Sequence, residues 1–519
     1  MSAPSLRRAG VAVIGVTLLA KGVGYVREAV VAAVFGTTSV VDLYLAAAAI
    51  PAVICTVIYY SVPNAFVPLF SGSHQMRRRA RITASGLLVV MLGLSAAVWL
   101  WASPLSNLLV RGFPESARSE SAHLLRIGAW AIVFATLEAL GRSRLLAGKH
   151  FVRPGLAFLW QSAAMVTAVL VWPEHGARAL VWGFVAGTGL AALWNLAARQ
   201  AAVPDAVTPS PHSESASAMS ASRWVMAVFL VDAIAQAFSL IDRHFGSYLP
   251  AGSIAALQYA NQIAFIPFSV LGMGLSTAIF PYLSDAVAAN DGARTEIVLD
   301  RAVRWSLLGV VPMAVGMIVF RQDVVTLLLE RGAFNAASRQ LTATALAAFS
   351  VGLVPSVLAA LWSRVFYSSR QWRPILYGSL VGISAKAVCG WWWVQSAGVT
   401  GLAAATAVAH CVWVLPLFWI LRTAIPTERF LAWGSYGVRV LLLAAVPAVL
   451  VWWLAHIVSP DGSLPVHAAA VARLSAGAAA SILSLLLLGP RWQIGEAGTV
   501  LPWMVRALRS VGGDSHRGE

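Results

Sequence analysis

The chain has 519 residues, of which 59% are hydrophobic and 11% are charged, and its mean hydropathy is +0.75. This composition excludes a soluble globular domain and indicates an integral membrane protein. The net charge of +16 would suit a nucleic-acid partner, but the basic residues gather in alternate loops, for example at 77–81 and 142–153. That pattern predicts a multi-pass protein of the cytoplasmic (inner) membrane, with both termini in the cytoplasm and no nucleic-acid partner.

Hydrophobic stretches long enough to cross a bilayer recur along the whole chain. In chain order they cover residues 9–34, 41–70, 83–103, 121–146, 154–172, 178–198, 223–249, 253–284, 302–329, 337–367, 374–394, 398–422, 433–457 and 466–488. The sequence therefore predicts an all-α integral membrane protein with about 14 transmembrane helices. The first stretch carries internal charges and no small-residue cleavage site, so we expect a membrane helix rather than a cleaved signal peptide.

The first two stretches hold four charged residues close together: Lys21, Arg27, Glu28 and Asp42. A charge in the hydrocarbon costs about 3 kcal/mol or more, so ionisable residues within spans usually face a cavity or a partner. These four residues are therefore candidates for a functional site.

Two halves of the chain resemble one another. The segment FGTTSVVDLYLAAAAIP from Phe35 has a counterpart from Phe245, and GRSRLLAGKHFVRPGL matches LWSRVFYSSRQWRPIL, which pairs Arg144 with Arg364. The offset is 210 residues at the first match and 220 at the second. Each copy holds six stretches, so both enter the membrane the same way up. This predicts two six-helix lobes related by a pseudo-twofold axis along the membrane normal, with a substrate site between them.

The predicted boundaries follow from this repeat. Residues 1–198 form an N-lobe, 199–222 a cytoplasmic linker, 223–422 a C-lobe, and 423–519 two further helices and a cytoplasmic tail. The linker is rich in Pro, Ser and Ala and has no hydrophobic periodicity. The second helix of each lobe contains prolines, whose kinks would suit an alternating-access transporter, although proline is common in membrane helices.

Further charged residues lie within or near later stretches. One hypothesis pairs Asp232 with Lys386, because the two residues lie at similar depths along their helices; the alternative is that Lys386 snorkels or meets another acid. Arg243 faces either a cavity or the membrane interface, and the interface is narrowly favoured. Glu138 and Arg142 are spaced as an i,i+4 pair near a cytoplasmic helix end.

The segment from Lys21 to Pro68, with GYVREAVVAAVFG, Asp42 and AFVPLF, resembles the MurJ/MviN lipid II flippases. These belong to the multidrug, oligosaccharidyl-lipid and polysaccharide exporter superfamily. The resemblance implies a flippase that moves a polyprenyl-diphosphate-linked sugar precursor across the membrane by alternating access. Because no bond is made or broken, it implies neither an enzyme nor a cofactor or metal. Either the membrane potential or an ion gradient would drive the movement, and we expect a monomer among membrane lipids.

Carried over by position, the resemblance implies that Lys21 and Arg27 face a central cavity and bind the diphosphate. Glu28 and Asp42 would be the neighbouring acids. The alternative is that Arg27 and Glu28 lie near the outer end of the first helix and have a structural role. Some relatives hold a coupling cation in the second lobe, where the ammonium of Lys386 would take its place.

The chain departs from the family pattern at two places. Cys55 and Thr56 stand at or near the positions of an arginine pair, and Asn261 and Gln262 stand where the family has an acid and an arginine. Arg243 would supply the second-lobe cation in place of Gln262 if it faces the cavity. These departures leave open an exopolysaccharide-unit flippase that does not act on lipid II. A multidrug or small-cation exporter is less favoured, because the predicted cavity is cationic.

Overall fold

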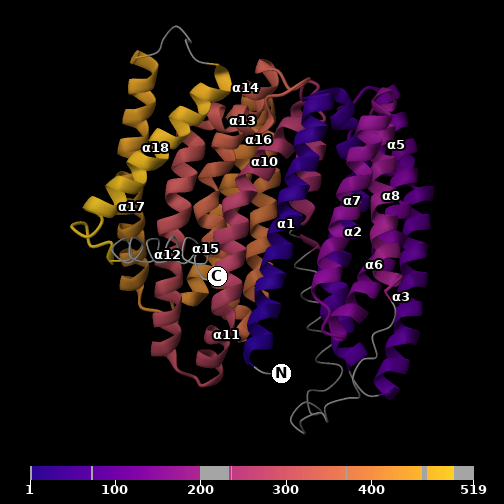
Figure 1. Cartoon of the computed structure of the whole chain (residues 1–519), viewed down its shortest axis with the longest axis horizontal. Helices are drawn as coiled ribbons and strands as arrows, with labels where there is room; N and C mark the ends of the chain where they lie inside the picture. The colour runs from indigo at the N-terminus through magenta and orange to yellow at the C-terminus, as the bar shows by residue number, and fades with distance from the viewer. Residues whose placement is uncertain are drawn as a thin grey trace, which may run out of the picture. The chain divides into compact units, whose positions relative to one another are not determined.

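The computed structural model describes residues 3–71, 74–198, 233–234, 236–369, 371–458 and 465–495 (Figure 1). Within these ranges the chain is helical almost throughout and contains no strand, so the predicted all-α fold is confirmed. The predicted linker at 199–222 and Asp232 lie outside the described residues. The chain divides into two compact units, which are described separately below.

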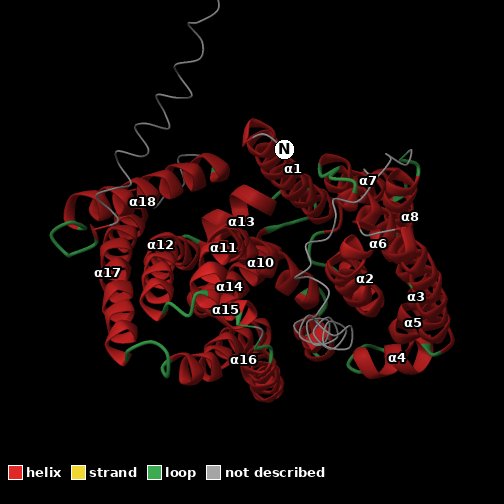
Figure 2. Ribbon diagram, turned by 90° about the horizontal axis from the view of Figure 1, so that it is seen from below, coloured by secondary structure: helices red, strands yellow, loops and turns green. Residues whose placement is uncertain are grey.

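The first unit contains residues 1–256 and 331–338. Its helices are α1 (Ala3–Phe35), α2 (Ser39–Ser71), α3 (His74–Leu100), α4 (Ala102–Leu109), α5 (Glu115–Gly128), α6 (Trp130–Ala147), α7 (Val152–Val171), η1 (Pro173–His175) and α8 (Ala177–Leu196), followed by a helical segment over 236–246. Helix α6 packs against α2 and α8, and α7 packs against α8 and α1. Figure 2 shows α2, α6, α7 and α8 end-on as a group, with α3 and α5 beside them.

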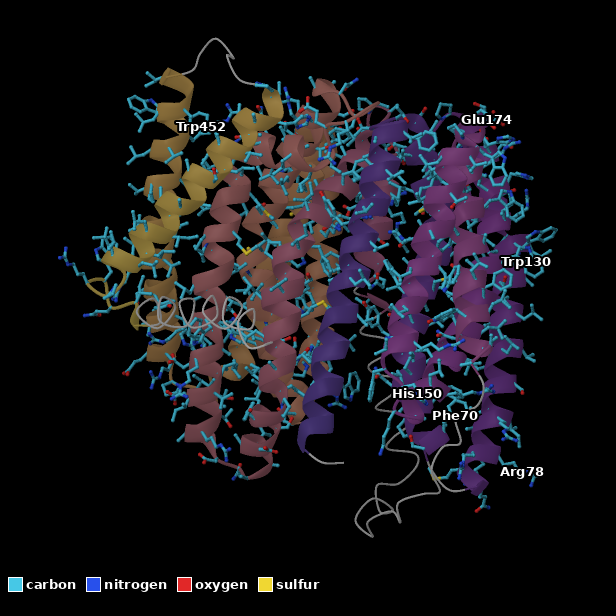
Figure 3. All side chains as sticks on the ribbon, in the orientation of Figure 1. Phe70, Arg78, Trp130, His150, Glu174 and Trp452 are labelled. Carbon is cyan, nitrogen blue, oxygen red and sulfur yellow. The ribbon has the colours of Figure 1, made fainter. Side chains whose placement is uncertain are left out.

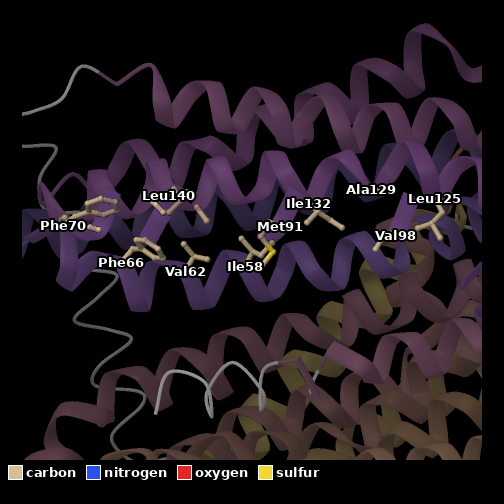
Figure 4. Close-up of a cluster of buried hydrophobic side chains, with 14 of the residues drawn as sticks. Ile58, Val62, Phe66, Phe70, Met91, Val98, Leu125, Ala129, Ile132 and Leu140 are labelled. Carbon is tan, nitrogen blue, oxygen red and sulfur yellow. The ribbon is translucent and has the colours of Figure 1, made fainter. Parts of the chain in front are cut away.

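A continuous apolar cluster runs along the length of this unit between α2, α3, α5 and α6 (Figure 4). Helix α2 contributes Ile58, Val62, Phe66 and Phe70 to it at helical spacing. Apolar side chains at i, i+4 and i+8 lie on one face, which explains why this stripe meets the neighbouring helices. The charged residues of the candidate site, on α1, at the start of α2 and in the segment 236–246, lie outside this apolar cluster.

The second unit contains residues 257–330 and 339–519. Its helices are α10 (Ser253–Pro267, whose first turn belongs to the first unit), η3 (Phe268–Gly274), α11 (Leu275–Ala288), α12 (Gly292–Val319), α13 (Arg321–Leu329), α14 (Ala336–Val351), α15 (Leu353–Ser368), α16 (Arg373–Leu421), α17 (Thr427–Val458) and α18 (Val466–Leu488). The segment η3 is a π-helix that begins directly after Pro267. A proline removes a backbone hydrogen bond, and the irregular turn begins next to this one.

Ten helices in the described ranges are long and apolar enough to span a membrane, or eleven if the bent pair α14 and α15 counts as one span. Each of the fourteen predicted stretches falls at least partly on a helix. The counts differ partly because α16 joins two predicted stretches across Gly398, whose φ of 55° breaks the helix. The number of fourteen therefore stays a prediction.

One contact occurs in both copies of the internal repeat. The guanidinium of Arg144 on α6 lies 5.4 Å from the ring centroid of Phe70 on α2. In the second copy, the guanidinium of Arg364 on α15 lies 5.7 Å from the ring of Phe280 on α11. The sequence offsets of 220 and 210 residues pair these four positions, so each copy builds the same cation–π contact.

The contact-based units do not coincide with the predicted lobes. Residues 233–256 and 331–338, which belong to the second repeat copy, pack with the first unit. For example, the N–H of Ala333 donates to the carbonyl of Ala33 at the end of α1, over 2.7 Å. The predicted lobe boundaries stay a prediction.

Figure 3 places Phe70, Arg78 and His150 at one end of the first unit and Glu174 at the other. Arg78 belongs to the basic run at 77–81 and His150 lies beside Lys149. Two of the basic segments identified from the sequence thus share one end of this unit.

Replacing Arg473 with alanine should loosen α18. Its Nη2 and Nε donate to Oδ1 of Asp323 on α13, over 2.6 and 2.9 Å, and the Asp323 side chain is nearly buried. Losing hydrogen bonds to a charged group costs about 1.5–3 kcal/mol, so the melting temperature of the detergent-solubilised protein should fall. The matched control is Arg178→Ala, because the pair of Arg178 with Glu120 is exposed and should contribute less than about 1 kcal/mol. Equal shifts for the two variants would contradict the prediction.

Candidate functional site

Arg27 and Glu28 on α1 form an ion pair. Nη2 of Arg27 donates to Oε1 of Glu28 over 2.6 Å, and both side chains are partly buried. The Arg27 guanidinium also lies 5.7 Å from the ring centroid of Phe158 on α7. Gly24 allows this approach, because a Cβ there would stand 2.9 Å from the same ring. The helix contact and the neighbouring acid therefore fix the orientation of the guanidinium.

Asp42, near the start of α2, accepts two backbone hydrogen bonds. Its Oδ2 accepts from the N–H of Gly252 over 2.6 Å, and its Oδ1 accepts from the N–H of Ala255 over 2.7 Å. The residue is 3% exposed. A carboxylate that binds the free amides at the start of a helix is a charge-assisted cap, here supplied to α10 by a residue 210 positions earlier. A contact of Asp42 with substrate stays a prediction.

Arg243 lies in the helical segment 236–246 and is only 7% exposed. It interacts electrostatically with Asp242, Asp42, Tyr44 and Glu28. A buried position among acids does not fit the interfacial position that the sequence narrowly favoured. The alternative, in which Arg243 faces a cavity, stays a prediction.

The structure adds Tyr44, which sequence reasoning missed. Tyr44 lies on α2 and interacts electrostatically with Arg27, Glu28 and Arg243. The one signal in the sequence was a polar hydroxyl in the otherwise apolar run LYLAAAA, and many tyrosines in membrane helices have no such role. Tyr44 thus links the α1 ion pair to Arg243.

The structure describes three of the four remaining predicted residues. Lys21 is on α1 and exposed, while Gln262 is on α10 in the second unit and partly exposed. Lys386 on α16 is 1% exposed and interacts electrostatically with His410. Because Asp232 is outside the described residues, the predicted ion pair of Asp232 with Lys386 stays a prediction.

The cluster combines two cations with three carboxylates, those of Glu28, Asp42 and Asp242. Two guanidinium groups, Arg27 and Arg243, lie among acids and a phenol that neutralise and orient them. Guanidinium groups donate several parallel hydrogen bonds to phosphate oxygens and stay charged at every physiological pH.

Comparison with known proteins decides the family. The profile of the family described as "Lipid II flippase MurJ" matches residues 31–472, which is most of the chain. The chain belongs to the lipid II flippase MurJ family. The lipid II flippase MurJ of Burkholderia cenocepacia is 25% identical over 474 residues, covering 87% of this chain and 90% of the relative. The probable lipid II flippase MurJ of Thermotoga maritima is 24% identical over 441 residues, covering 82% and 88%.

Solved structures agree with the MurJ fold. A lipid II flippase MurJ in an inward closed conformation has a TM-score of 0.76 and 19% identity, covering 92% of this chain and 99% of that chain. An inward-facing MATE-family multidrug resistance transporter of the MOP superfamily has a TM-score of 0.63 and 13% identity, covering 80% and 98%. At these identities the two structures establish the fold only.

Proposed function

We propose that this member of the MurJ family is a flippase that moves a lipid-linked peptidoglycan precursor, lipid II, across the cytoplasmic membrane. The observation that carries the proposal is the partly buried cluster of Arg27, Glu28, Asp42, Tyr44 and Arg243 in a chain of this family. Arg27 and Arg243 would bind the diphosphate, Glu28 would orient Arg27, and Asp42 would fix the segment that follows Arg243. Lys21, on the same helix as Arg27, is proposed as a further contact to the headgroup, and a role for Gln262 stays a prediction.

The protein would act as a transporter and not as an enzyme. Its substrate would cross unchanged while the helices rearrange, and the proline-containing α2 and the π-helical turn η3 are suitable points of bending. We place both termini in the cytoplasm, because the basic segments fall in alternate loops. We propose a monomer whose partners are the lipid-linked substrate and membrane lipids.

An apolar pocket in the second unit is suited to the prenyl chain of the substrate. It has a volume of about 600 Å³ and lies between α12, α14, α15, α16 and α17. Trp362, Phe418, Phe430 and Trp433 line it together with aliphatic side chains. Burying apolar lipid against such a surface is favourable by about 25 cal/mol per Å².

The driving force is proposed to come from the membrane potential or an ion gradient. Lys386 is a buried cation within α16. An ammonium at this position would take the place of a bound coupling ion, and Asp232 is its proposed partner. Transport that does not require an added metal cation is the outcome this proposal expects.

The test is rescue of bacteria depleted of their own lipid II flippase. The intact chain should restore growth, and Arg27→Ala should reduce rescue at least about tenfold in viable count, because one charge-assisted contact contributes about 1.5–3 kcal/mol. Arg178→Ala, at an exposed surface pair, is the matched control and should rescue fully. Membrane levels of each variant are measured by immunoblot.

Two results would count against the proposal. If the intact protein reaches the membrane but does not rescue, the cargo is another lipid-linked glycan, such as an exopolysaccharide unit. If Arg27→Ala rescues as well as the intact protein, the cluster is not the headgroup site.

A further inference from the structure

Arg142 on α6 lies on an aromatic ring of α2. Its guanidinium is 3.9 Å from the ring centroid of Tyr59, a close cation–π contact. Its Nε and Nη1 are buried, and neither has a hydrogen-bond partner among the residues that the structure describes. A buried donor without an acceptor costs about 1–3 kcal/mol, so an acceptor for these two N–H groups would stabilise the guanidinium in this position.

The neighbouring acid does not meet this need. Glu138, one turn earlier on α6, interacts electrostatically with Arg142, but its Oε1 accepts from Nδ2 of Asn195 on α8 over 2.9 Å. The predicted i,i+4 pair is therefore present only as an electrostatic contact. Asn195 holds the carboxylate and Tyr59 holds the guanidinium, and the described residues offer no acceptor to two of the guanidinium's donors.

The internal repeat shows that the fold does not require this arrangement. The contact of Arg144 with Phe70 recurs as that of Arg364 with Phe280, as expected of a structural element of both copies. By the same offsets, the positions matching Glu138, Arg142 and Tyr59 are Leu358, Trp362 and Ser269. The second copy has a leucine, a tryptophan and a serine at these positions, so its helices form without this arrangement.

The surroundings indicate the ligand. Helix α2 carries no basic residue between Pro51 and Ser71, so Arg142 supplies a cation to this part of α2 from the neighbouring helix. The ring of Tyr60, which is exposed, stands perpendicular to that of Tyr59 at 5.1 Å. A guanidinium beside two tyrosines combines donors for phosphate oxygens with flat faces that suit sugar rings.

We propose that Arg142 binds the phosphate groups of the transported lipid at a second position on its path, about 25 Å along α2 from Asp42, and, with Tyr59, determines which headgroup is accepted. Nε and Nη1 donate to phosphate oxygens, and Glu138 and Asn195 hold the cation in place. This inference rests on the proposed flippase function. It adds a residue that neither the family resemblance nor the sequence spacing assigned to the substrate.

The test measures binding by the purified full-length protein in nanodiscs. The probes are undecaprenyl diphosphate, undecaprenol and phosphatidylglycerol. Arg142→Gln should raise the Kd for undecaprenyl diphosphate at least about tenfold, equivalent to about 1.4 kcal/mol, and leave undecaprenol binding unchanged. Arg142→Lys keeps the charge without the planar fork and should give an intermediate Kd. Arg144→Gln is the matched control and should stay within about twofold of the intact protein.

The outcomes separate the inference from the function on which it rests. If the intact protein binds undecaprenyl diphosphate no better than undecaprenol, the proposed function itself fails. If it prefers the diphosphate and Arg142→Gln does so equally, only the role of Arg142 is overturned. If Arg142→Gln weakens the binding of phosphatidylglycerol as much as that of undecaprenyl diphosphate, the proposed selectivity of Arg142 is also overturned, since the site would then bind any anionic lipid. Should Arg142→Gln not fold, an unchanged Kd for Arg142→Lys would overturn the role.

Discussion

Replacing Gly252 with alanine is expected to destabilise the protein strongly and abolish rescue of flippase-depleted cells. Gly252 has a φ of +90°, a conformation that costs other residues about 1–3 kcal/mol. A Cβ at this position would also overlap the carbonyl oxygen of Thr37. Relieving that overlap would pull the Gly252 N–H away from Asp42, so the strain, the clash and the lost cap act in the same direction.

The measurement is the melting temperature of the detergent-solubilised protein, together with its yield in the membrane. Gly93→Ala is the matched control, because Gly93 lies within α3 and a Cβ there would meet no atom within 4 Å. Alanine favours a helix over glycine by about 1 kcal/mol, so this variant should be neutral or slightly stabilising. A Gly252→Ala variant as stable as Gly93→Ala would show that the turn at Gly252 is not held as described.

The helices of this protein are largely predictable from its sequence. Hydropathy can be read from a local stretch of sequence. A single apolar segment in lipid must form a helix, because only a helix makes all its backbone hydrogen bonds within the segment. Apolar stretches such as 41–70 and 466–488 therefore coincide with α2 and α18. The sequence did not predict whether the chain forms a loop or a kinked helix at Gly398, because a glycine between two apolar stretches is equally consistent with both. The two contact-based units were not predicted either.

The candidate site was predictable in its residue types but not in its contacts. Arg27 and Glu28 are adjacent in the sequence. Because burying charges in a membrane is costly, two charged residues in an apolar stretch can be recognised as a candidate site from the sequence alone. The partners of Asp42 are backbone amides 210 and 213 residues away, and backbone groups carry no sequence signal. Arg142 was assigned to Glu138 by helical spacing, yet its guanidinium lies on Tyr59 of another helix. Tertiary packing decides such choices.

Replacing Asp42 with asparagine is expected to lower stability by about 2 kcal/mol, read as a fall in melting temperature. The carboxylate accepts from two amides, whereas an asparagine side chain presents one acceptor and one NH2 group that would face a second N–H. Hydrogen bonds to a charged group contribute about 1.5–3 kcal/mol, and the negative charge also suits the start of α10. Glu120→Gln, at an exposed acid, is the control and should change stability by less than about 0.5 kcal/mol.

A double-mutant cycle distinguishes this structural role from a contact to substrate alone. Asp42 and Arg243 interact electrostatically, so Arg243→Gln should be less destabilising beside Asp42→Asn than in the intact protein. For neighbours in one buried network the difference should be about 0.5–3 kcal/mol. If Asp42→Asn left the melting temperature unchanged and weakened only rescue, the carboxylate would serve the substrate and not the start of α10. Loss of both, with coupling to Arg243, would mean that Asp42 supports the headgroup site by holding the segment that carries Arg243.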